Sequence, residues 1–380
     1  MPDATSGYSF RFVRNVLAKT LVLLLAANLL FALVNPMPSL GKLTLYNWLF
    51  PGRERLPFGE DPGEAYNLSL LSLDAMFASH EVSRPKAPDE FSVLVVGDSS
   101  AWGILLKPDQ TMAGLINASG YRTPDGRQVR AYNLGYPTLS LTKDLLILDW
   151  ARRYQPDMII WPVTLEAFPR DQQLSSPIIQ HNPQEVRRLI QTYRLNLNIH
   201  DPALVDPSFW QRTLFGQSRN LANILRLQVY GALWAATGID QYYPQTYELR
   251  ANDLPADQTF DGLNPPHLAK DALAFDVLEA GMSIYKDIPV LLVNEPMFIS
   301  NGSNSNIRYN FYYPRWAYDD YRQLLSAEAQ QNKWQYLDLW NAIPTAEFTN
   351  SAIHLDTAGS AQLAEKIGQA ITSDLGMVAP

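Results

Sequence analysis

The chain has 380 residues, of which 47% are hydrophobic, and this size and composition support a packed globular region. Its formal net charge of −8 argues against a general nucleic-acid-binding protein, which would present a basic face. The absence of cysteine excludes disulfides, thiolate catalysis and cysteine-ligated metals, and the five histidines lack a metal-binding spacing. We therefore expect no metal site and no cofactor.

An apolar segment near the N-terminus, residues 16–35, approaches the length of about 20 residues that spans a bilayer as a helix. Arg11, Arg14 and Lys19 lie at its N-terminal side, and the positive-inside rule therefore places residues 1–15 in the cytoplasm. We expect an uncleaved single-pass anchor in the cell membrane, followed by an extracytoplasmic domain. A cleaved signal peptide is the main alternative, although no small-x-small cleavage site follows, and a buried core helix is the other.

Residues 36–90 contain many proline, glycine and charged residues without a long periodic pattern, which predicts a juxtamembrane linker with one short helix near residues 68–79. From residue 91 onward, strand and helix patterns alternate as in an α/β domain built on a parallel sheet. The expected strands are 91–96, 129–134, 157–163, 288–294 and 335–339, and the expected helices are 109–119, 140–154, 268–286, 315–331 and 357–374. They predict a three-layer α/β/α sandwich with a mostly parallel, flavodoxin-like sheet of five strands over residues 91–375.

The first strand of this domain ends in an unusual polar turn. Its aliphatic residues, typical of a buried parallel strand, stop abruptly at Gly97, Asp98 and Ser99, and Gly97 allows a sharp turn. Ser99 then lies at the start of the next helix, where free backbone N–H groups can bind an anion. The turn predicts a nucleophile with part of an oxyanion hole or, more simply, a strand–turn–helix with a capping serine.

The stretch 168–267 interrupts the alternation of strands and helices and contains two helical patterns. We expect it to cap the edge of the sheet at which the strands end. Its aromatic residues Trp210, Phe215, Tyr230 and Trp234 either line a glycan groove, touch the membrane surface, or simply pack the insertion onto the sheet.

A histidine, His354, lies shortly before the C-terminal helical pattern 357–374. A serine hydroxyl is a weak nucleophile at neutral pH and needs a base such as this histidine. The imidazole in turn needs a partner on its other nitrogen to fix its tautomer. Asn350, a backbone carbonyl, Asp356 and Glu347 are the candidates for that partner.

An early strand-end serine paired with a histidine before a C-terminal amphipathic helix resembles the SGNH/GDSL hydrolase superfamily over most of residues 91–375. The first block of that superfamily matches Val96-Gly-Asp-Ser99, the second Ala131-Tyr-Asn-Leu-Gly135, and the last the segment around His354. The resemblance implies that Ser99 is the nucleophile, His354 its base and the Gly135 backbone N–H an oxyanion donor. The chain is similar to the membrane-anchored, extracytoplasmic branch, whose members work with membrane-bound O-acyltransferases on surface polysaccharides and teichoic acids.

Two positions depart from the superfamily pattern. Its acid stands three residues before the histidine, where this chain has Ser351, and Asn350 is the nearest residue that can take the acid's place. Its third block carries a glycine and an asparagine that completes the oxyanion hole, and here Thr164 and Glu166 occupy those positions. Because an ionised carboxylate only accepts hydrogen bonds, Glu166 is not expected to stabilise an oxyanion.

Further polar residues follow the expected strands at the same edge of the sheet, where ligands bind in folds of this type. Thr164 follows strand 157–163, while Asn294 and Glu295 follow or end strand 288–294. We expect these three to contact substrate, or alternatively to be loop and helix-entry residues. The cluster of planar and cationic side chains within 308–316 also suits sugars.

The leading hypothesis is a membrane-anchored, extracytoplasmic serine esterase or O-acyltransferase that acts through an acyl-Ser99 intermediate on a carbohydrate polymer or acylated glycan. A membrane-bound O-acyltransferase is its expected partner. The main alternative is a catalytically impaired scaffold of the same fold that binds a glycan or that partner. A soluble, secreted lipase-like hydrolase is the third hypothesis, and an intact N-terminal span would exclude it.

Overall fold

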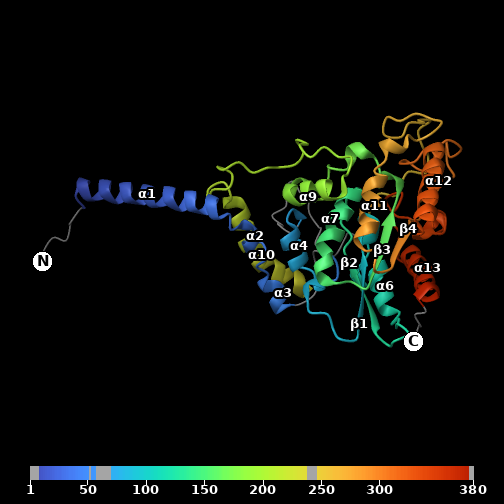
Figure 1. Ribbon diagram of the computed structural model, residues 1–380, viewed down its shortest axis with the longest axis horizontal. Coiled ribbons are helices and arrows are strands. Elements are labelled where there is room, and N and C mark those ends of the chain that lie inside the picture. The colour runs from blue at the N-terminus through green and yellow to red at the C-terminus, as the bar shows by residue number, and fades with distance from the viewer. Residues whose placement is uncertain (1–7, 51–52, 57–69, 238–245, 376–380) are drawn as a thin grey trace.

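The computed structural model describes residues 8–50, 53–56, 70–237 and 246–375 (Figure 1). Its centre is one sheet of five parallel strands in the order β2-β1-β3-β4-β5, the order of flavodoxin-like folds. The strands are β1 (Glu90–Val95), β2 (Gln128–Asn133), β3 (Met158–Val163), β4 (Val290–Asn294) and β5 (Gln335–Asp338). The predicted sheet is therefore confirmed, with strand bounds that differ from the expected ones by at most two residues.

Helices cover both faces of the sheet, so the central strands are buried at every position. Leu94 and Val96 pack toward one face, and Val93 and Val95 toward the other. The first face carries α7 (Leu141–Ala151), α11 (Phe275–Ile284) and α12 (Arg315–Asn332), and the second carries α6 (Met112–Ala118) and α13 (Thr357–Leu375). The three-layer sandwich follows from this alternation of apolar side chains.

The predicted helices 140–154 and 268–286 are shorter in the structure. The first ends as α7 and continues in the 3-10 turn η4 (Arg152–Tyr154). The second is preceded by the 3-10 turn η8 (Lys270–Ala272), because Ala274 donates a backbone hydrogen bond of 2.9 Å to Phe168. That bond holds the chain extended before α11 begins.

Part of the predicted linker 36–90 belongs to the domain. Its described residues form α2 (Met37–Leu40), α3 (Leu45–Leu49), α4 (Leu73–Ala78) and the 3-10 turn η2 (Glu81–Ser83). Leu56, Leu73, Met76 and Phe77 are fully buried in the same core as α7. The sequence pattern missed this packing because each piece is too short to show a helical period.

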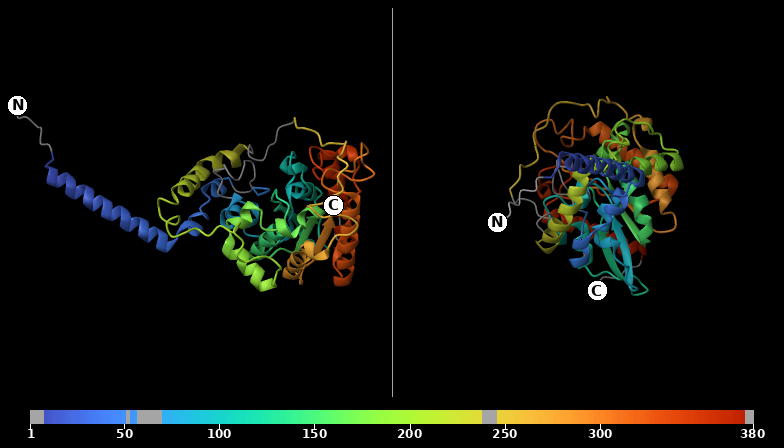
Figure 2. Two further views of the ribbon diagram at one scale, coloured as in Figure 1. Left: turned by 90° about the horizontal axis from the view of Figure 1, so that it is seen from above. Right: turned by 90° about the vertical axis from the view of Figure 1, so that its left-hand side faces the viewer.

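The N-terminal helix α1 (Phe10–Val34) projects away from the rest of the molecule (Figures 1 and 2). Among the described residues it is the one helix that is long and apolar enough to cross a membrane. It begins before the expected span and ends at Asn35, whose left-handed backbone (φ 47°) closes the helix ahead of Pro36. Length and composition fit either a membrane span or a signal sequence.

The insertion 168–267 lies partly against α3 and partly near the C-terminal loop. It contains the 3-10 turn η6 (Arg170–Gln172) and the helices α8 (Pro177–Gln180), α9 (Pro183–Tyr193) and α10 (Ser218–Thr237). Helix α10 packs against α3 on the side from which α1 emerges, whereas Arg250 bonds to Thr349 near the C-terminal loop. The expectation that the whole insertion caps the sheet edge is therefore wrong for α10.

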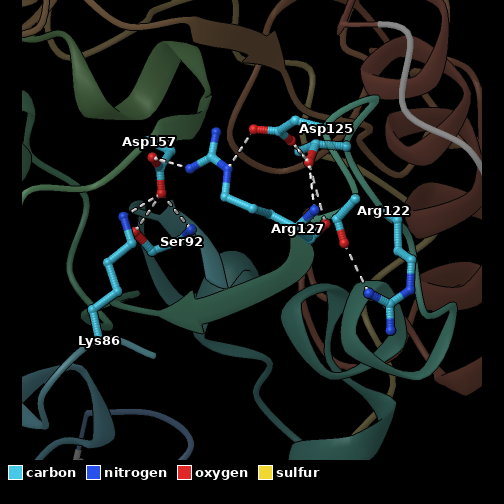
Figure 3. A network of polar contacts seen from close by, with 8 residues as sticks. Lys86, Ser92, Arg122, Asp125, Arg127 and Asp157 are labelled. Carbon is cyan, nitrogen blue, oxygen red and sulfur yellow. Dashed lines mark hydrogen bonds and ion pairs between the residues drawn. The ribbon is translucent and has the colours of Figure 1, made fainter. Parts of the chain in front are cut away.

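A polar network ties the strands together at their amino ends (Figure 3). Asp157 accepts hydrogen bonds from the Ser92 backbone N–H at 2.7 Å and the Ser92 hydroxyl at 3.0 Å, and from Arg127 at 2.9 Å. Lys86 also donates to Asp157. The network lies at the edge opposite Ser99, so we assign it a structural role.

Candidate active site

Ser99 begins α5 (Ser99–Trp102), a single helical turn that follows β1. Asp98 is its N-cap and accepts a hydrogen bond of 2.7 Å from the Ser100 backbone N–H. A Cβ on Gly97 would lie 2.8 Å from the Ala101 Cβ and 3.3 Å from the Pro162 carbonyl oxygen. Glycine is needed here mainly because the first turn of α5 crowds this position, and not because of a positive φ.

A chain of hydrogen bonds joins Ser99 to the C-terminal loop. His354 Nε2 lies 2.7 Å from Ser99 Oγ, and His354 Nδ1 lies 2.8 Å from Asn350 Oδ1. With Nδ1–H donating to the Asn350 carbonyl oxygen, Nε2 is unprotonated and can accept the Ser99 proton. The structure therefore brings together three of the four residues expected to carry the chemistry.

The loop between η9 (Thr345–Glu347) and α13 explains how Asn350 reaches the imidazole from an unusual spacing. A backbone bond of 2.9 Å from Thr349 N–H to the His354 carbonyl oxygen closes the loop, so Asn350 and His354 meet across it. Asp356 instead accepts from the Gly359 N–H at 2.8 Å at the start of α13. Its charge raises the pKa of Glu347, and neither carboxylate replaces Asn350 at His354.

Burial lowers the pKa of His354 to about 4. In a full triad, a carboxylate would oppose this shift by favouring the imidazolium. Here the partner is a neutral amide, so the imidazole is a weak base that stays neutral at physiological pH.

The backbone N–H of Gly135, the expected second oxyanion donor, already forms a hydrogen bond within the protein. Its backbone N–H donates to Asn133 Oδ1 at 3.0 Å, and the Asn133 amide donates to the Trp102 carbonyl at 3.2 Å. A Cβ on Gly135 would lie 2.3 Å from the Trp102 nitrogen, so glycine allows the end of β2 to pack on α5. The expectation for Gly135 is corrected: its N–H serves this internal contact, while Ser99 N–H keeps its place at a helix N-terminus.

Thr164 and Asn294 are buried inside the protein and do not line the site. Both are fully buried; the Thr164 hydroxyl bonds to that of Tyr313 at 2.8 Å. Asn294 donates to Asp338 at 2.8 Å and accepts from two tyrosine hydroxyls of α12, which ties β4 to β5 and the helix. The prediction that they contact substrate is wrong, because their polar atoms are bonded inside the protein.

Glu166 lies in the 3-10 turn η5 (Leu165–Ala167) that follows β3. Burial and the charge of Asp261 raise the pKa of Glu166 to about 7, while Arg308 opposes the shift. A carboxyl that is partly protonated at neutral pH can donate a hydrogen bond, which an ionised one cannot. The expectation that Glu166 only accepts therefore does not hold at neutral pH.

The sugar-binding cluster expected within 308–316 is partly internal: Arg308, Tyr309, Asn310 and Tyr313 are buried, whereas Arg315 and Trp316 are half-buried. Arg308 is buried and donates to backbone carbonyl oxygens of Asp257, Asn310, Phe311 and Tyr312. These bonds use its guanidinium to hold the loop before α12.

Glu295 is placed beside the nucleophile turn. Its carboxylate accepts the Ser100 hydroxyl, and one of its two oxygens has no hydrogen-bond partner within the described part of the chain. Burial, and then the neighbouring charge of Asp98, raise its pKa well above the usual range. It lines a small cavity with Ser100, His354 and apolar residues, among them Ile104, Met112 and Leu363.

Two charged residues that the sequence analysis missed, Lys143 and Asp144, lie under this turn. Lys143 is fully buried and donates to the carbonyl oxygens of Gly97 at 2.7 Å and Tyr136 at 3.2 Å. It also forms an ion pair with Asp144 at 2.6 Å. Their only sequence signal is two adjacent charges at the start of the mostly apolar helix α7.

Comparisons with known proteins add little. No family model and no curated protein matches the chain. Among solved structures, it is similar to a lipolytic protein of the G-D-S-L family from Veillonella parvula (TM-score 0.36, 10% identity, covering 74% of this chain and 98% of that one). A carbohydrate acetylesterase from Sinorhizobium meliloti gives a TM-score of 0.32 at 15% identity, and an aryl esterase from M. smegmatis 0.33 at 12%, each covering 74% of this chain and 98% of its own. These similarities are too distant to assign a function, which has to be inferred from the site itself.

Proposed function

We propose that the chain is an SGNH-type serine esterase or O-acyltransferase that acts through an acyl-Ser99 intermediate. The observation that supports it most is the hydrogen-bonded chain from Ser99 through His354 to Asn350. Segments that are far apart in sequence build this chain at the carboxyl edge of a parallel sheet, where ligands bind in such folds.

In the proposed reaction, Ser99 Oγ attacks the ester carbonyl carbon while His354 Nε2 takes the hydroxyl proton. The backbone N–H of Ser99 stabilises the oxyanion of the tetrahedral intermediate. When that intermediate collapses, His354 returns the proton to the departing alcohol and leaves the acyl group on Ser99. Water then completes hydrolysis, or a sugar hydroxyl accepts the acyl group.

The small cavity beside His354 has mostly apolar walls, which come from the Ser99 turn, the loops after β4 and before α13, α6 and α13. Its volume of about 10 Å³ holds about one water molecule, so it does not set the size of the acyl group.

For the location, we propose that α1 is an uncleaved membrane span with residues 1–15 in the cytoplasm and the α/β domain outside. The apolar length of α1 and the positive charges at its N-terminal side support this orientation. A surface carbohydrate polymer as substrate and a membrane-bound O-acyltransferase as partner complete the proposal.

The experiment is to measure hydrolysis of p-nitrophenyl acetate by the full chain in detergent, and acetyl transfer to a polysaccharide acceptor. Ser99→Ala should abolish both, whereas Ser100→Ala, one residue away on the same turn, should retain most of the activity. Equal activity in the wild-type chain and Ser99→Ala would contradict the proposal.

A non-catalytic scaffold is the second candidate. The engaged Gly135 N–H and the neutral Asn350 favour it, because both weaken catalysis. Binding of an acetylated polysaccharide without turnover in the same assay would support this alternative.

A further inference from the structure

A second apolar surface lies beside α1 on the side from which that helix emerges. It consists of Leu45, Trp48 and Leu49 of α3 and Leu225, Val229 and Leu233 of α10, all of them exposed. Trp48 is 80% exposed and Leu225 is 71% exposed, which is unusual for side chains of this size. These are two groups of three exposed residues on neighbouring helices, and we call them together the α3–α10 face.

The spacing on α10 shows that this exposure is organised. Leu225, Val229 and Leu233 are four residues apart and share one side of the helix. Other residues of α10, including Ile224, Leu227 and Gly231, are buried, and Gly231 approaches the Tyr46 ring so closely that a Cβ would lie 2.7 Å from it. Helix α10 therefore has one apolar side packed on α3 and another turned outward.

The α3–α10 face is fixed to the rest of the molecule. Gln228 accepts from the Leu45 backbone N–H at 2.7 Å and donates to the Leu43 carbonyl at 2.8 Å. Asn28 of α1 accepts from the Phe215 backbone N–H at 3.0 Å, which ties α1 to the loop before α10. The face and the last turns of α1 therefore form one connected unit (Figures 1 and 2).

We propose that the α3–α10 face is seated in the headgroup layer of a lipid bilayer, beside the point where α1 leaves it; this rests on the proposed anchoring by α1. An amphipathic helix in this position buries its apolar side about 5–10 Å into the boundary between headgroups and acyl chains. Trp210, exposed shortly before α10, is of the amphipathic aromatic kind enriched at membrane–water interfaces.

Charge also favours lipid as the occupant. Helix α10 carries two exposed basic residues, Arg219 and Arg226, and no acidic one, although the whole chain has a net charge of −8. Residues 36–50 carry a single charge, on Lys42. A basic, otherwise apolar surface complements anionic lipid headgroups.

Seating the face would place the nucleophile close to the membrane. Shortly after α3, Arg55 donates to the carbonyl oxygens of Trp102 at 3.0 Å and Gly103 at 2.8 Å, at the end of the turn that begins with Ser99. Arg55 is buried and is not part of the α3–α10 face, but it follows α3 closely in the chain and links this region to the Ser99 turn.

Because the chain has no cysteine, single cysteines can report on separate positions of the full protein. Trp48→Cys and Val229→Cys probe the face, Leu23→Cys probes the middle of α1, and Leu249→Cys is a matched exposed control (66%) outside both. Each variant carries a nitrobenzoxadiazole label and is reconstituted in vesicles of phosphatidylcholine and phosphatidylglycerol. Doxyl groups near the glycerol end of the acyl chains quench shallow labels, such as those expected at 48 and 229, and doxyl groups near the methyl end quench a deep label, such as that expected at 23.

We expect blue-shifted emission and loss of most of the fluorescence for the labels at 48 and 229, and neither effect for the label at 249. Quenching at 23 but not at 48 and 229 would overturn the seated face while leaving the anchor intact. No quenching at 23 would overturn the anchor as well. A blue shift at 48 and 229 without lipid quenching would show that protein, a second copy or a partner, covers the face, and would also overturn the proposal.

Discussion

The hydrogen-bonded chain at the site differs from a full triad in one functional group, the amide of Asn350. An amide oxygen can fix the imidazole tautomer, but it carries no charge to stabilise the imidazolium that forms in the transition state. Burial without a compensating charge keeps the pKa of His354 at about 4. The imidazole is therefore oriented for proton transfer but is a weak base, which predicts slow turnover.

Asn350→Asp should raise turnover, because a carboxylate would stabilise the imidazolium and raise the pKa of His354. The opposite change costs about 10⁴-fold in a serine protease, which sets the upper limit of the expected gain. In the wild-type chain, activity should persist as the pH falls until about 4, where His354 becomes protonated. In the variant this acid limb should move to higher pH. The pH–rate profile of p-nitrophenyl acetate hydrolysis tests both effects. Asn350→Ala is the control and should lose activity. A profile that is the same for Asn350→Asp and the wild-type chain would show that Asn350 does not act on His354.

Glu295 should make the protein less stable as the pH rises. Its pKa is raised from the ordinary value of 4.5 by burial and by Asp98, so the folded state favours the protonated form. This preference contributes stability at low pH that is lost as the pH rises through the folded-state pKa. Glu295→Gln keeps an acceptor for Ser100 and removes the ionisation, so its Tm should vary less between about pH 5 and about pH 9. A steeper dependence in the variant would contradict the assignment.

Among the elements, the strands were predictable and the short helices were not. The three central strands β1, β3 and β4 are largely apolar runs, and burial between two helical layers selects that pattern directly. The edge strands β2 and β5 carry more polar residues. Helices α2, α3 and α4 have four to six residues, too few for a period to be visible. The start of α11 was misplaced because a tertiary hydrogen bond to Phe168 overrides local helix propensity.

The same distinction applies to the site. Ser99 and His354 stand in motifs whose local sequence carries the signal, and Asn350 is close to His354 in the chain. The hydrogen bond from the Gly135 backbone N–H to the Asn133 side-chain oxygen is a local Asx-type turn, which the Asn-Leu-Gly order permits but does not require. The buried pair Lys143–Asp144 was missed because adjacent charges at a helix start usually indicate a solvent-exposed turn.

Arg55 should stabilise the turn that carries Ser99. Its guanidinium is fully buried, stacks 3.8 Å from the centre of the Trp102 ring and donates to three backbone carbonyl oxygens around residues 102–106. Arg55→Met should lower the free energy of unfolding by about 1.5–3 kcal/mol and reduce turnover, because the carbonyl oxygens lose their charged donor.

The matched control for this prediction is Arg122→Met. Arg122 also donates to a carbonyl oxygen, that of Gly126, but from an exposed turn at the opposite edge of the sheet (Figure 3). Its effect on chemical denaturation should stay within about 0.5 kcal/mol. Equal effects of the two substitutions would show that Arg55 has no special role.

At the scale of the whole molecule, the boundary of the folded unit lies before residue 53 and not near 91. Removing residues 1–35 should leave a domain that still folds, although its exposed α3–α10 face should require detergent. Removing residues 1–90 also deletes Leu56, Leu73, Met76 and Phe77 from the core.

Truncating one such side chain costs about 2–5 kcal/mol, so losing four costs about 8–20 kcal/mol, as much as the whole stability of a typical domain, about 5–15 kcal/mol. The longer deletion should therefore give no cooperative thermal transition, and circular dichroism of the two truncated chains in the same detergent measures this. A cooperative transition in the chain that lacks residues 1–90 would place the predicted linker outside the folded unit after all.

The most direct test of the central claim is the reaction of the full chain with a fluorophosphonate, followed by intact-mass and peptide mass spectrometry. An activated serine attacks this reagent, so the account predicts one adduct, on Ser99, which is lost in Ser99→Ala and strongly reduced in His354→Ala. No adduct on the folded wild-type chain, or an adduct on another serine such as Ser100, would contradict the account.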